Sequence, residues 1–325
     1  MRYALQVMSE QTAFARGALA GRIESVSATA LASGALLPIA TSWEFVEEKR
    51  VQFFVRVLAN IQRKNDQRAK EERGAAAGRP FNPFLPYEQA LFVADVSETH
   101  VAILNKFNVV DNHLLIVTRE FEQQRALLTL PDFEAWWRCL GEYESLGFYN
   151  GGPEAGASQL HKHLQLVPLP LVPQGPPVPI EPLLAGVRGT AGNEMIPGFD
   201  FVHSFARLGE PTSESGAARE AFERYAAMLG TVGLRPPSGS GADLQSAPYC
   251  LLATREWLLL VPRSREFFGS ISVNALGFAG ALLVRDEEQL RALRAAGPFT
   301  ALRQTALPLP EGRSRLESPR GSPGS

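Results

Sequence analysis

The fold is decided by one stretch, Asn150-Gly-Gly-Pro-Glu-Ala-Gly-Ala-Ser-Gln-Leu-His-Lys-His-Leu-Gln-Leu-Val-Pro168. In it, a glycine-rich loop runs directly into residues that alternate in the manner of a β-strand. Side chains two positions apart on a strand share a face and lie about 6.6 Å apart. His161, His163 and Gln165 are therefore expected on one side of the strand. Lys162 is expected on the other.

The loop and the strand together predict a site for phosphate chemistry. Glycines at 151, 152 and 156 let the backbone turn sharply and approach a ligand closely. Exposed N–H groups of such a loop hold phosphate oxygens, and Ser158 and Gln159 add polar groups beside them. Neutral imidazole is a competent nucleophile, because its ordinary pKa of about 6.5 leaves most of it unprotonated near neutral pH. We therefore expect a covalent nucleotidyl-histidine intermediate.

Other interpretations of the histidines are weaker. One histidine on a strand is more often structural than catalytic, but a pair of them after a glycine loop is far more specific. His161 and His163 could bind zinc, yet no carboxylate or cysteine nearby offers a third ligand, so no metal site is predicted. His100, His113 and His203 are interpreted as structural.

Composition bounds the class of protein. The chain has 325 residues, 45% of them apolar, and a formal net charge of -2, which does not favour a nucleic-acid binder. The two cysteines, Cys139 and Cys250, are expected as buried thiols in a reducing compartment. Residues 1–11 lack an apolar signal region and 25–40 is too short to span a bilayer, so we expect a soluble cytoplasmic protein that binds no membrane.

Hydrophobic periodicity predicts the other elements. Strands are expected over 51–58, 90–96, 101–104, 114–117, 249–253 and 257–261, of which the second to fourth form an antiparallel meander. Helices are expected over 130–146, with Pro131 in the first turn and an aromatic face on the sheet, and over 215–229. A surface loop is expected over 66–79, followed by a rigid extended segment over 80–86.

Four separated segments resemble those of a known family. They are residues 82–87, residues 104–121, the 150–165 motif, and residues 254–264 together with 273–280. In these segments the chain resembles the diadenosine tetraphosphate (Ap4A) phosphorylases, also called ATP adenylyltransferases. These form a branch of the histidine-triad (HIT) superfamily that is related to the galactose-1-phosphate uridylyltransferases. The likeness spans roughly residues 45 to 290.

The resemblance implies roles for individual residues. His163 would be the nucleophile that takes the AMP group, with His161 as its supporting neighbour. Gln165 stands where the hydrolase branch has a third histidine, which favours transfer of the nucleotidyl group over hydrolysis. The implied substrate contacts are Lys64, Asn105, Lys106, Asn150, Gly156, Ala157, Ser158, Gln159, Gln165, Asn274, Ala275, Leu276 and Arg285. The chain departs from the family pattern with Leu160 in place of a proline and with Arg285 where lysine is common.

The expected fold is α+β, with a HIT-like antiparallel sheet and packed helices in two HIT-like halves. The expected organisation is an N-terminal extension over 1–44, a catalytic domain over 45–173, a Pro/Gly-rich linker over 174–198, a C-terminal ATP adenylyltransferase domain over 199–310 and a disordered tail over 311–325. The active site is expected mainly in the first half.

The expected function is phosphorolysis of Ap4A to ATP and ADP through an AMP-histidine intermediate. The ligands would be a dinucleoside polyphosphate and inorganic phosphate, with no covalent cofactor and with Mg²⁺ only as a counter-ion of the nucleotide. Two alternatives stay open: a sugar-1-phosphate nucleotidyltransferase of the uridylyl type, and a nucleotide-binding sensor without turnover. The oligomeric state also stays open, with a monomer as one option.

Overall fold

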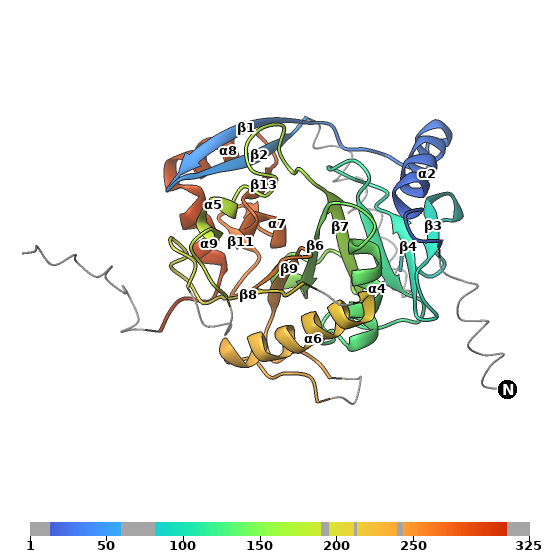
Figure 1. Ribbon diagram of the computed structural model, residues 1–325. Coiled ribbons are helices and arrows are strands. Elements are labelled where there is room, and N and C mark those ends of the chain that lie inside the picture. Colours follow the sequence, from blue (N-terminus) through green and yellow to red (C-terminus); the bar gives the residue numbers. More distant parts are fainter. Residues whose placement is uncertain (1–13, 60–81, 190–194, 211–212, 239–242, 311–325) are drawn as a thin grey trace, which may run out of the picture.

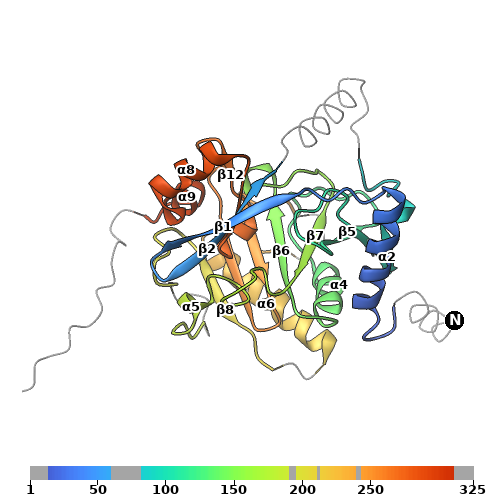
Figure 2. The ribbon, with the colours of Figure 1, turned by 90° about the horizontal axis from the view of Figure 1, so that it is seen from above.

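The computed structural model describes residues 14–59, 82–189, 195–210, 213–238 and 243–310. Its centre is an eight-stranded sheet with the strand order β3-β4-β5-β7-β6-β9-β10-β8. Figures 1 and 2 show the molecule in two views. All neighbouring strands in this sheet are antiparallel. The strands are β3 Phe92–Asp95, β4 His100–Leu104, β5 Leu114–Thr118, β6 Ser145–Gly151, β7 His163–Pro168, β8 Ser204–Arg207, β9 Tyr249–Ala253 and β10 Trp257–Pro262.

The predicted antiparallel sheet with packed helices is confirmed, including the β3-β4-β5 meander. Strands from both halves of the chain belong to the same sheet. β6 pairs with β9, so that Asn150 lies opposite Cys250. The motif strand β7 lies between β5 and β6, near the middle of the sheet, where backbone hydrogen bonds constrain it on both sides.

Each face of the sheet has its own apolar core. On one face lie α2 Leu19–Ser33, α4 Leu130–Leu140 and α6 Glu214–Thr231, packed with Leu164 and Leu166 of β7. Val167 of β7 joins the core of the opposite face. That face is covered by β1 Thr41–Glu48, β2 Val51–Leu58 and β13 Ala281–Val284, which form a three-stranded sheet, and by α5 Glu181–Leu184, α7 Ala275–Phe278, α8 Glu287–Ala296 and α9 Pro298–Thr305. The short elements are η1 Gln89–Leu91, η2 Pro153–Ala155, β11 Phe267–Phe268 and β12 Ile271–Ser272.

The helix predicted over 130–146 is correct at its start and wrong at its end. Helix α4 stops at Leu140, is followed by Gly141, and strand β6 begins at Ser145. Helix and strand then pack closely, since a Cβ on Gly147 would lie 2.5 Å from the indole of Trp136. The aromatic face of the helix therefore rests on the sheet, as predicted.

Two expected irregular segments also differ from the prediction. Residues 83–86 form a turn rather than an extended segment, because the Asn82 side chain accepts a hydrogen bond from the Phe84 N–H (3.0 Å). The segment expected as a linker contains α5 and buries residues such as Ile180 and Leu184 in the core. The loop over 66–79 and the tail over 311–325 lie outside the described residues, and the predicted domain boundaries stay a prediction.

Other expectations agree with the structure. The strands predicted from 51, 249 and 257 and the helix predicted over 215–229 are confirmed as β2, β9, β10 and α6. Both cysteines are buried and free. None of the helices in the described ranges combines the length and the apolar composition needed to cross a membrane.

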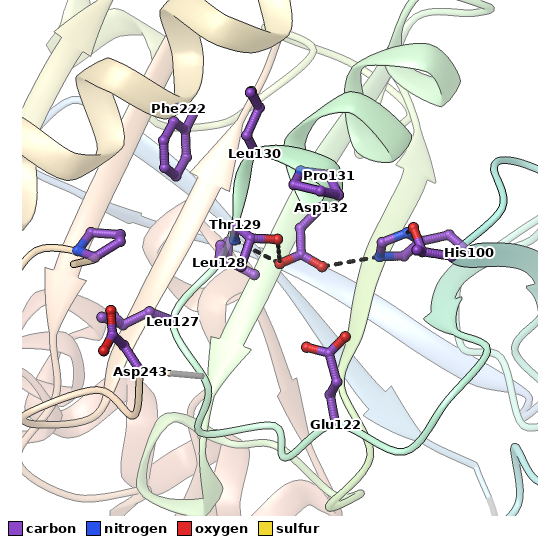
Figure 3. Close-up of a pocket in the computed structure, with 12 residues that line it drawn as sticks. His100, Glu122, Leu127, Leu128, Thr129, Leu130, Pro131, Asp132, Phe222 and Asp243 are labelled. Atoms are coloured by element: carbon purple, nitrogen blue, oxygen red, sulfur yellow. Dashed lines mark hydrogen bonds and ion pairs between the residues drawn. The ribbon is translucent and has the colours of Figure 1, made fainter. Parts of the chain in front are cut away.

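One buried carboxylate connects three elements. Asp132 lies in the first turn of α4, where it accepts from the backbone N–H of Thr129 (2.7 Å) in a capping box. It also contacts the ring of His100 from β4 (3.0 Å) and the ammonium of Lys162, next to β7 (2.9 Å). A cavity of about 400 Å³ borders this cluster, and Figure 3 shows Asp132 between Thr129 and His100.

Asp132 stays ionised in this position. Burial alone would raise the pKa of Asp132, but the hydrogen bond from His100 and the charge of Lys162 outweigh burial and hold the pKa well below its usual range. A depressed carboxyl pKa stabilises the fold above the ordinary pKa of about 3.9 and loses that effect as the pH falls further. The contribution of Asp132 should therefore be complete above about pH 5.

Replacing Asp132 by alanine should lower the free energy of unfolding by about 3–5 kcal/mol at pH 7, because it leaves the Lys162 ammonium buried without its main partner. Denaturant unfolding measures the change, with Glu134→Ala on the exposed side of α4 as the control. The difference between Asp132→Asn and the unchanged protein should shrink as the pH falls below about 4, because the unfolded chain then binds a proton at Asp132 that the native carboxylate does not bind. A variant with unchanged stability would contradict this role of Asp132.

Candidate active site

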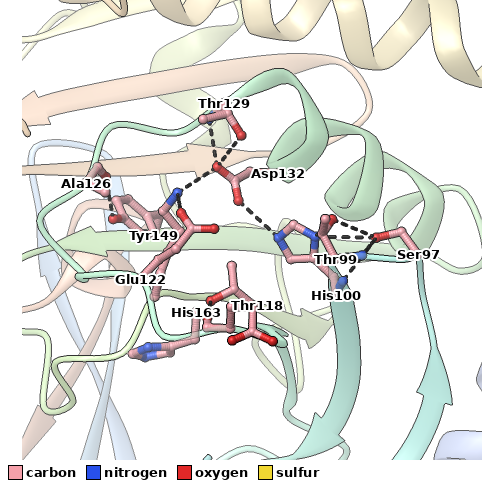
Figure 4. Close-up of polar contacts among 12 residues, drawn as sticks. Ser97, Thr99, His100, Thr118, Glu122, Ala126, Thr129, Asp132, Tyr149 and His163 are labelled. Carbon is pink, nitrogen blue, oxygen red and sulfur yellow. Dashed lines mark hydrogen bonds and ion pairs between the residues drawn. The ribbon is translucent and has the colours of Figure 1, made fainter. Parts of the chain in front are cut away.

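The two faces of the motif strand carry different chemistry. His163 and Gln165 point to one side of β7, while Leu164 joins the helix-side core, as the alternation predicts. Lys162 points to the same side as Leu164 and is completely buried. His161 precedes the strand and forms an isolated bridge with Gln123. In Figure 4 the ring of His163 points away from the Asp132 cluster.

His161 has no ring nitrogen left for catalysis. Its Nε2 lies 2.8 Å from the carbonyl of Thr118, which can only accept, so Nε2 carries the proton. Its Nδ1 accepts from the side-chain amide of Asn82 (2.9 Å). Burial lowers the pKa of His161 despite these hydrogen bonds. The ring is therefore a neutral, fixed support beside the strand.

His163 has one free ring nitrogen. Its Nδ1 donates to the backbone carbonyl of His161 (2.8 Å), so the proton sits on Nδ1 and the lone pair sits on Nε2. Within the described ranges nothing hydrogen-bonds to Nε2. Burial lowers the pKa of His163 to about 4, against the opposing effect of the carbonyl. The imidazole is therefore neutral and oriented, with Nε2 available as a nucleophile.

Gln165 is oriented by two residues from the β4–β5 connection. The Oδ1 of Asn105 accepts from the Phe107 N–H (3.3 Å), which turns its Nδ2 toward the Nδ1 of His113 (3.1 Å). The Nε2–H of His113 then donates to the Oε1 of Gln165 (3.1 Å). Among the described residues, this order of donors and acceptors leaves the amide NH₂ of Gln165 without a hydrogen-bond partner, on the face that carries His163.

His113 was interpreted from the sequence as structural, and the structure places it inside this network instead. Burial lowers its pKa to about 4, so it acts as a neutral donor. In the sequence, His113 directly precedes the strand predicted over 114–117, and a predicted helix separates that strand from the motif. The pairing of β5 with β7, which sets Leu115 opposite Gln165, brings the ring of His113 to the side chain of Gln165.

The glycine loop uses most of its own N–H groups. Those of Gly152, Ala155, Gly156 and Ala157 all donate to carbonyls inside the loop or to Asn150. Gly152 and Gly156 have φ values of 96° and 90°, which only glycine adopts readily. Within the described part of the chain, the N–H groups of Ser158 and Gln159 have no such partner. The donors available for a phosphate are therefore fewer than the sequence indicated.

The loop rests on residues from the second half of the chain. The buried side chain of Asn150 accepts from the Ala275 N–H (2.9 Å), and Asn274 caps α7 by accepting from the Leu276 N–H (3.1 Å). A Cβ on Gly156 would lie 2.8 Å from the Cβ of Asn274. The predicted group at 274–276 therefore meets the predicted loop.

Two buried side chains that the sequence did not single out hold the loop and the strand. Arg263 donates to the carbonyls of Ala155 (3.3 Å) and Val273 (2.8 Å). Gln124 donates to the carbonyl of Asn150 and accepts from the His163 N–H. Gln124 lies in none of the four family-like segments, and Arg263 lies in one of them without a role assigned to it there, since each acts on backbone groups that come together only in the fold.

Three predicted contacts lie apart from this centre or outside the description. Lys106 pairs with Glu88 at the surface (2.5 Å). Arg285 is exposed after β13, and no hydrogen bond or ion pair links its side chain to the motif within the described residues. Lys64 lies outside the described residues. In the ranges that the structure covers, no group of three or more His, Cys, Asp or Glu side chains is arranged to hold a metal ion.

Comparison with protein families gives two matches that follow each other along the chain. The model of the Ap4A phosphorylase N-terminal domain matches residues 9–186. The model of the ATP adenylyltransferase C-terminal domain matches residues 197–308. The first match includes the motif and His113, and the second includes Arg263 and 274–276.

Individual relatives agree with these matches. The chain is 27% identical over 268 residues to diadenosine 5',5'''-P1,P4-tetraphosphate phosphorylase 2 of Saccharomyces cerevisiae, which covers 74% of this chain and 79% of the relative. The crystal structure of the yeast Ap4A phosphorylase Apa2 superposes with a TM-score of 0.72 at 24% identity, over 91% of this chain and 96% of that one. Apa2 in complex with Ap4A superposes with a TM-score of 0.70, over 89% and 97%. These structures show that the two chains share the fold.

The protonation of His163 can be measured directly. In an NMR pH titration of the imidazole resonances, His163 should titrate with a midpoint of about 4, because burial disfavours the charged ring. The resonance is assigned by its loss in His163→Gln. A midpoint of about 6.5, the value of an exposed imidazole, would mean that His163 is not buried as described.

Proposed function

Since the chain belongs to the Ap4A phosphorylase family, we propose that it cleaves Ap4A with inorganic phosphate to give ATP and ADP. The observation that carries this proposal is the pairing on one strand face of a free imidazole nitrogen, Nε2 of His163, with a free amide donor on Gln165. The first group can attack phosphorus. The second can stabilise the negative charge that develops on its oxygens.

The reaction divides into two displacements at the same phosphorus. In the first, Nε2 of His163 attacks the α-phosphorus of one adenosine moiety, the bond to the bridging oxygen breaks, and ATP leaves. In the second, an oxygen of inorganic phosphate attacks this phosphorus, the P–N bond breaks, and ADP leaves. Each displacement is easier than direct attack of phosphate on the polyphosphate chain, because imidazole is both a good nucleophile and a good leaving group.

Positioned acceptors support the intermediate. When Nε2 bonds to phosphorus while Nδ1 keeps its proton, the imidazole ring becomes positively charged. The carbonyl of His161 accepts from that Nδ1–H and stabilises the charge. Collapse of the P–N bond returns the ring to its neutral, low-pKa state, which favours release of the nucleotide.

Gln165 favours transfer over hydrolysis. An amide cannot take a proton from water, so the site lacks a base at this position that could activate water. A phosphate ion arrives already negatively charged and needs no such base. We expect Mg²⁺ only as the counter-ion of the nucleotide, and contacts from Lys64, Lys106 and Arg285 to the polyphosphate remain part of this proposal. Buried, free cysteines support a reducing compartment such as the cytoplasm.

The direct test is incubation with Ap4A with and without inorganic phosphate, following ATP and ADP. We expect both products only when phosphate is present, and a loss of about a thousandfold or more in His163→Ala, because the covalent route is then closed. A uridylyl sugar substrate serves as the comparison for the related branch. Release of AMP without phosphate would mean hydrolysis, and binding of Ap4A without turnover would favour a sensor.

The network behind Gln165 makes a separate prediction. His113→Phe keeps a buried ring but removes the donor to Gln165, so the amide is free to rotate its NH₂ away from phosphate. In His113→Phe we expect kcat to fall about tenfold with little change in KM. In Gln165→Ala we expect kcat to fall about a hundredfold, in line with the loss of one donor to a developing charge. Steady-state kinetics at saturating phosphate measures both. Unchanged kcat in His113→Phe together with impaired Gln165→Ala would show that Gln165 needs no orientation.

A further inference from the structure

On its β6 side, the catalytic end of the motif strand is held by a loop rather than by a strand, while on the other side β5 pairs with it as far as Val117 opposite His163. Pairing of β6 with β7 stops at Phe148 opposite Gln165, so the ladder ends before it reaches His163. Beyond that point the segment 122–124 hydrogen-bonds to the backbone that leads into β7. The Lys162 N–H donates to the Glu122 carbonyl (2.8 Å), and the Gln124 N–H donates to the Leu160 carbonyl (2.7 Å).

The side chain of Gln124 fills the gap that opens between the two strands. Its Oε1 accepts from the His163 N–H (2.8 Å). Its Nε2 lies 2.9 Å from the Asn150 carbonyl and 3.3 Å from the His163 carbonyl. One buried amide therefore satisfies the backbone of the nucleophile and ties it to the end of β6.

Packing alone does not hold the side chain of Glu122 in place. The side chain of Glu122 borders the cavity of about 400 Å³ in Figure 3, which none of the motif residues lines. A cavity wall lacks the close contacts that fix buried side chains. The side chain of Glu122 is held instead by an ion pair, in which its carboxylate lies 2.7 Å from the ammonium of Lys162.

Lys162 occupies a position where an apolar residue would serve stability as well. Its neighbour on the same face, Leu164, is core. Burial would lower the pKa of Lys162, but Asp132 and Glu122 outweigh it and raise the pKa, so the ammonium stays charged. Buried ion pairs contribute little net stability compared with apolar packing, but they define geometry. The pair with Asp132 anchors Lys162 to helix α4, and the pair with Glu122 reaches the loop.

The anchored residue sits between the two histidines. The carbonyl of His161, which begins the peptide to Lys162, is the acceptor that fixes Nδ1–H of His163. A shift of this peptide would release the ring and mix its tautomers, and only the Nδ1–H tautomer leaves Nε2 free to attack.

We propose that Glu122 and Lys162 are positioning residues for His163: their ion pair, on the face of the strand opposite the chemistry, pins segment 122–124 and the 161–162 peptide, and thereby holds the imidazole in its attacking tautomer. This inference rests on the proposed function, since it assigns a role in the same reaction. The two ion pairs of Lys162 then have different roles. The pair with Asp132 stabilises the fold, and the pair with Glu122 sets the geometry of the catalytic imidazole.

The test uses Glu122→Ala, because Glu122 is partly exposed and its loss leaves Lys162 paired with Asp132. We expect kcat for Ap4A phosphorolysis to fall about ten- to hundredfold, the range for misplacement of a reacting group by about 1 Å, with KM changed less than about twofold. Glu122→Gln should recover part of kcat, since its amide oxygen still accepts from the ammonium. Glu120→Ala, an exposed carboxylate of the same loop, is the matched control and should keep the unchanged kcat.

A readout without substrate separates this inference from the proposed function. In ¹⁵N NMR of the imidazole, His163 should be a single Nδ1–H tautomer in the unchanged protein and a mixture in Glu122→Ala, with the thermal midpoint nearly unchanged. A single tautomer and full kcat in Glu122→Ala would overturn the positioning role, as would a loss of activity that only follows the unfolded fraction. If the unchanged protein fails to cleave Ap4A, the proposed function fails, while the tautomer measurement still decides the positioning role.

Discussion

The buried contact between Lys162 and Asp132 is the constraint on which the rest of the site depends. It joins the strand that carries the nucleophile to the capped first turn of helix α4, and His100 extends the contact to strand β4. Each of the charges would be unfavourable alone at this depth. Together they fix the order of helix, strand and loop behind the catalytic face, at a place where apolar packing would tolerate small displacements.

A single strand separates structure from chemistry because its side chains alternate. Residues 162, 164 and 166 anchor the strand to the helices, while 163 and 165 remain available on the other face. Movement along the strand by one residue would exchange the two sets and bury the histidines in the core. The central position of β7 between β5 and β6 makes that exchange unfavourable, so the sheet itself protects the register of the site.

The hydrogen bonds around the motif form a network in which nearly every donor and acceptor of the described residues has a partner. Asn82 and Thr118 bond to the two ring nitrogens of His161. Asn105 bonds to one nitrogen of His113, and the other nitrogen donates to the side-chain carbonyl of Gln165. Within the part of the chain that the structure describes, the Nε2 lone pair of His163 and the NH₂ of Gln165 have no partner on the catalytic face. Preorganisation of this kind lets the site meet the charge of the transition state without rearrangement. The same principle explains why the loop N–H groups of Gly152 to Ala157, already satisfied internally, contribute shape more than binding.

Local pattern was sufficient for the parts of this protein that depend on neighbouring residues in the chain. The alternation of 161–165, the start of α4 with Pro131 in its first turn, the meander of β3 to β5 and the buried cysteines all follow from local composition and periodicity, and the motif indicated its own chemistry. The end of α4 and the packing of residues 178–187 could not be predicted in this way, because apolar residues there suit helix, strand or coil until a partner surface is present. The roles of His113, Gln124 and Glu122 were decided only by the tertiary structure. Each acts on a group more than 35 residues away in the chain, and such a contact leaves no periodic signal because sheet pairing, rather than sequence spacing, brings its two ends together.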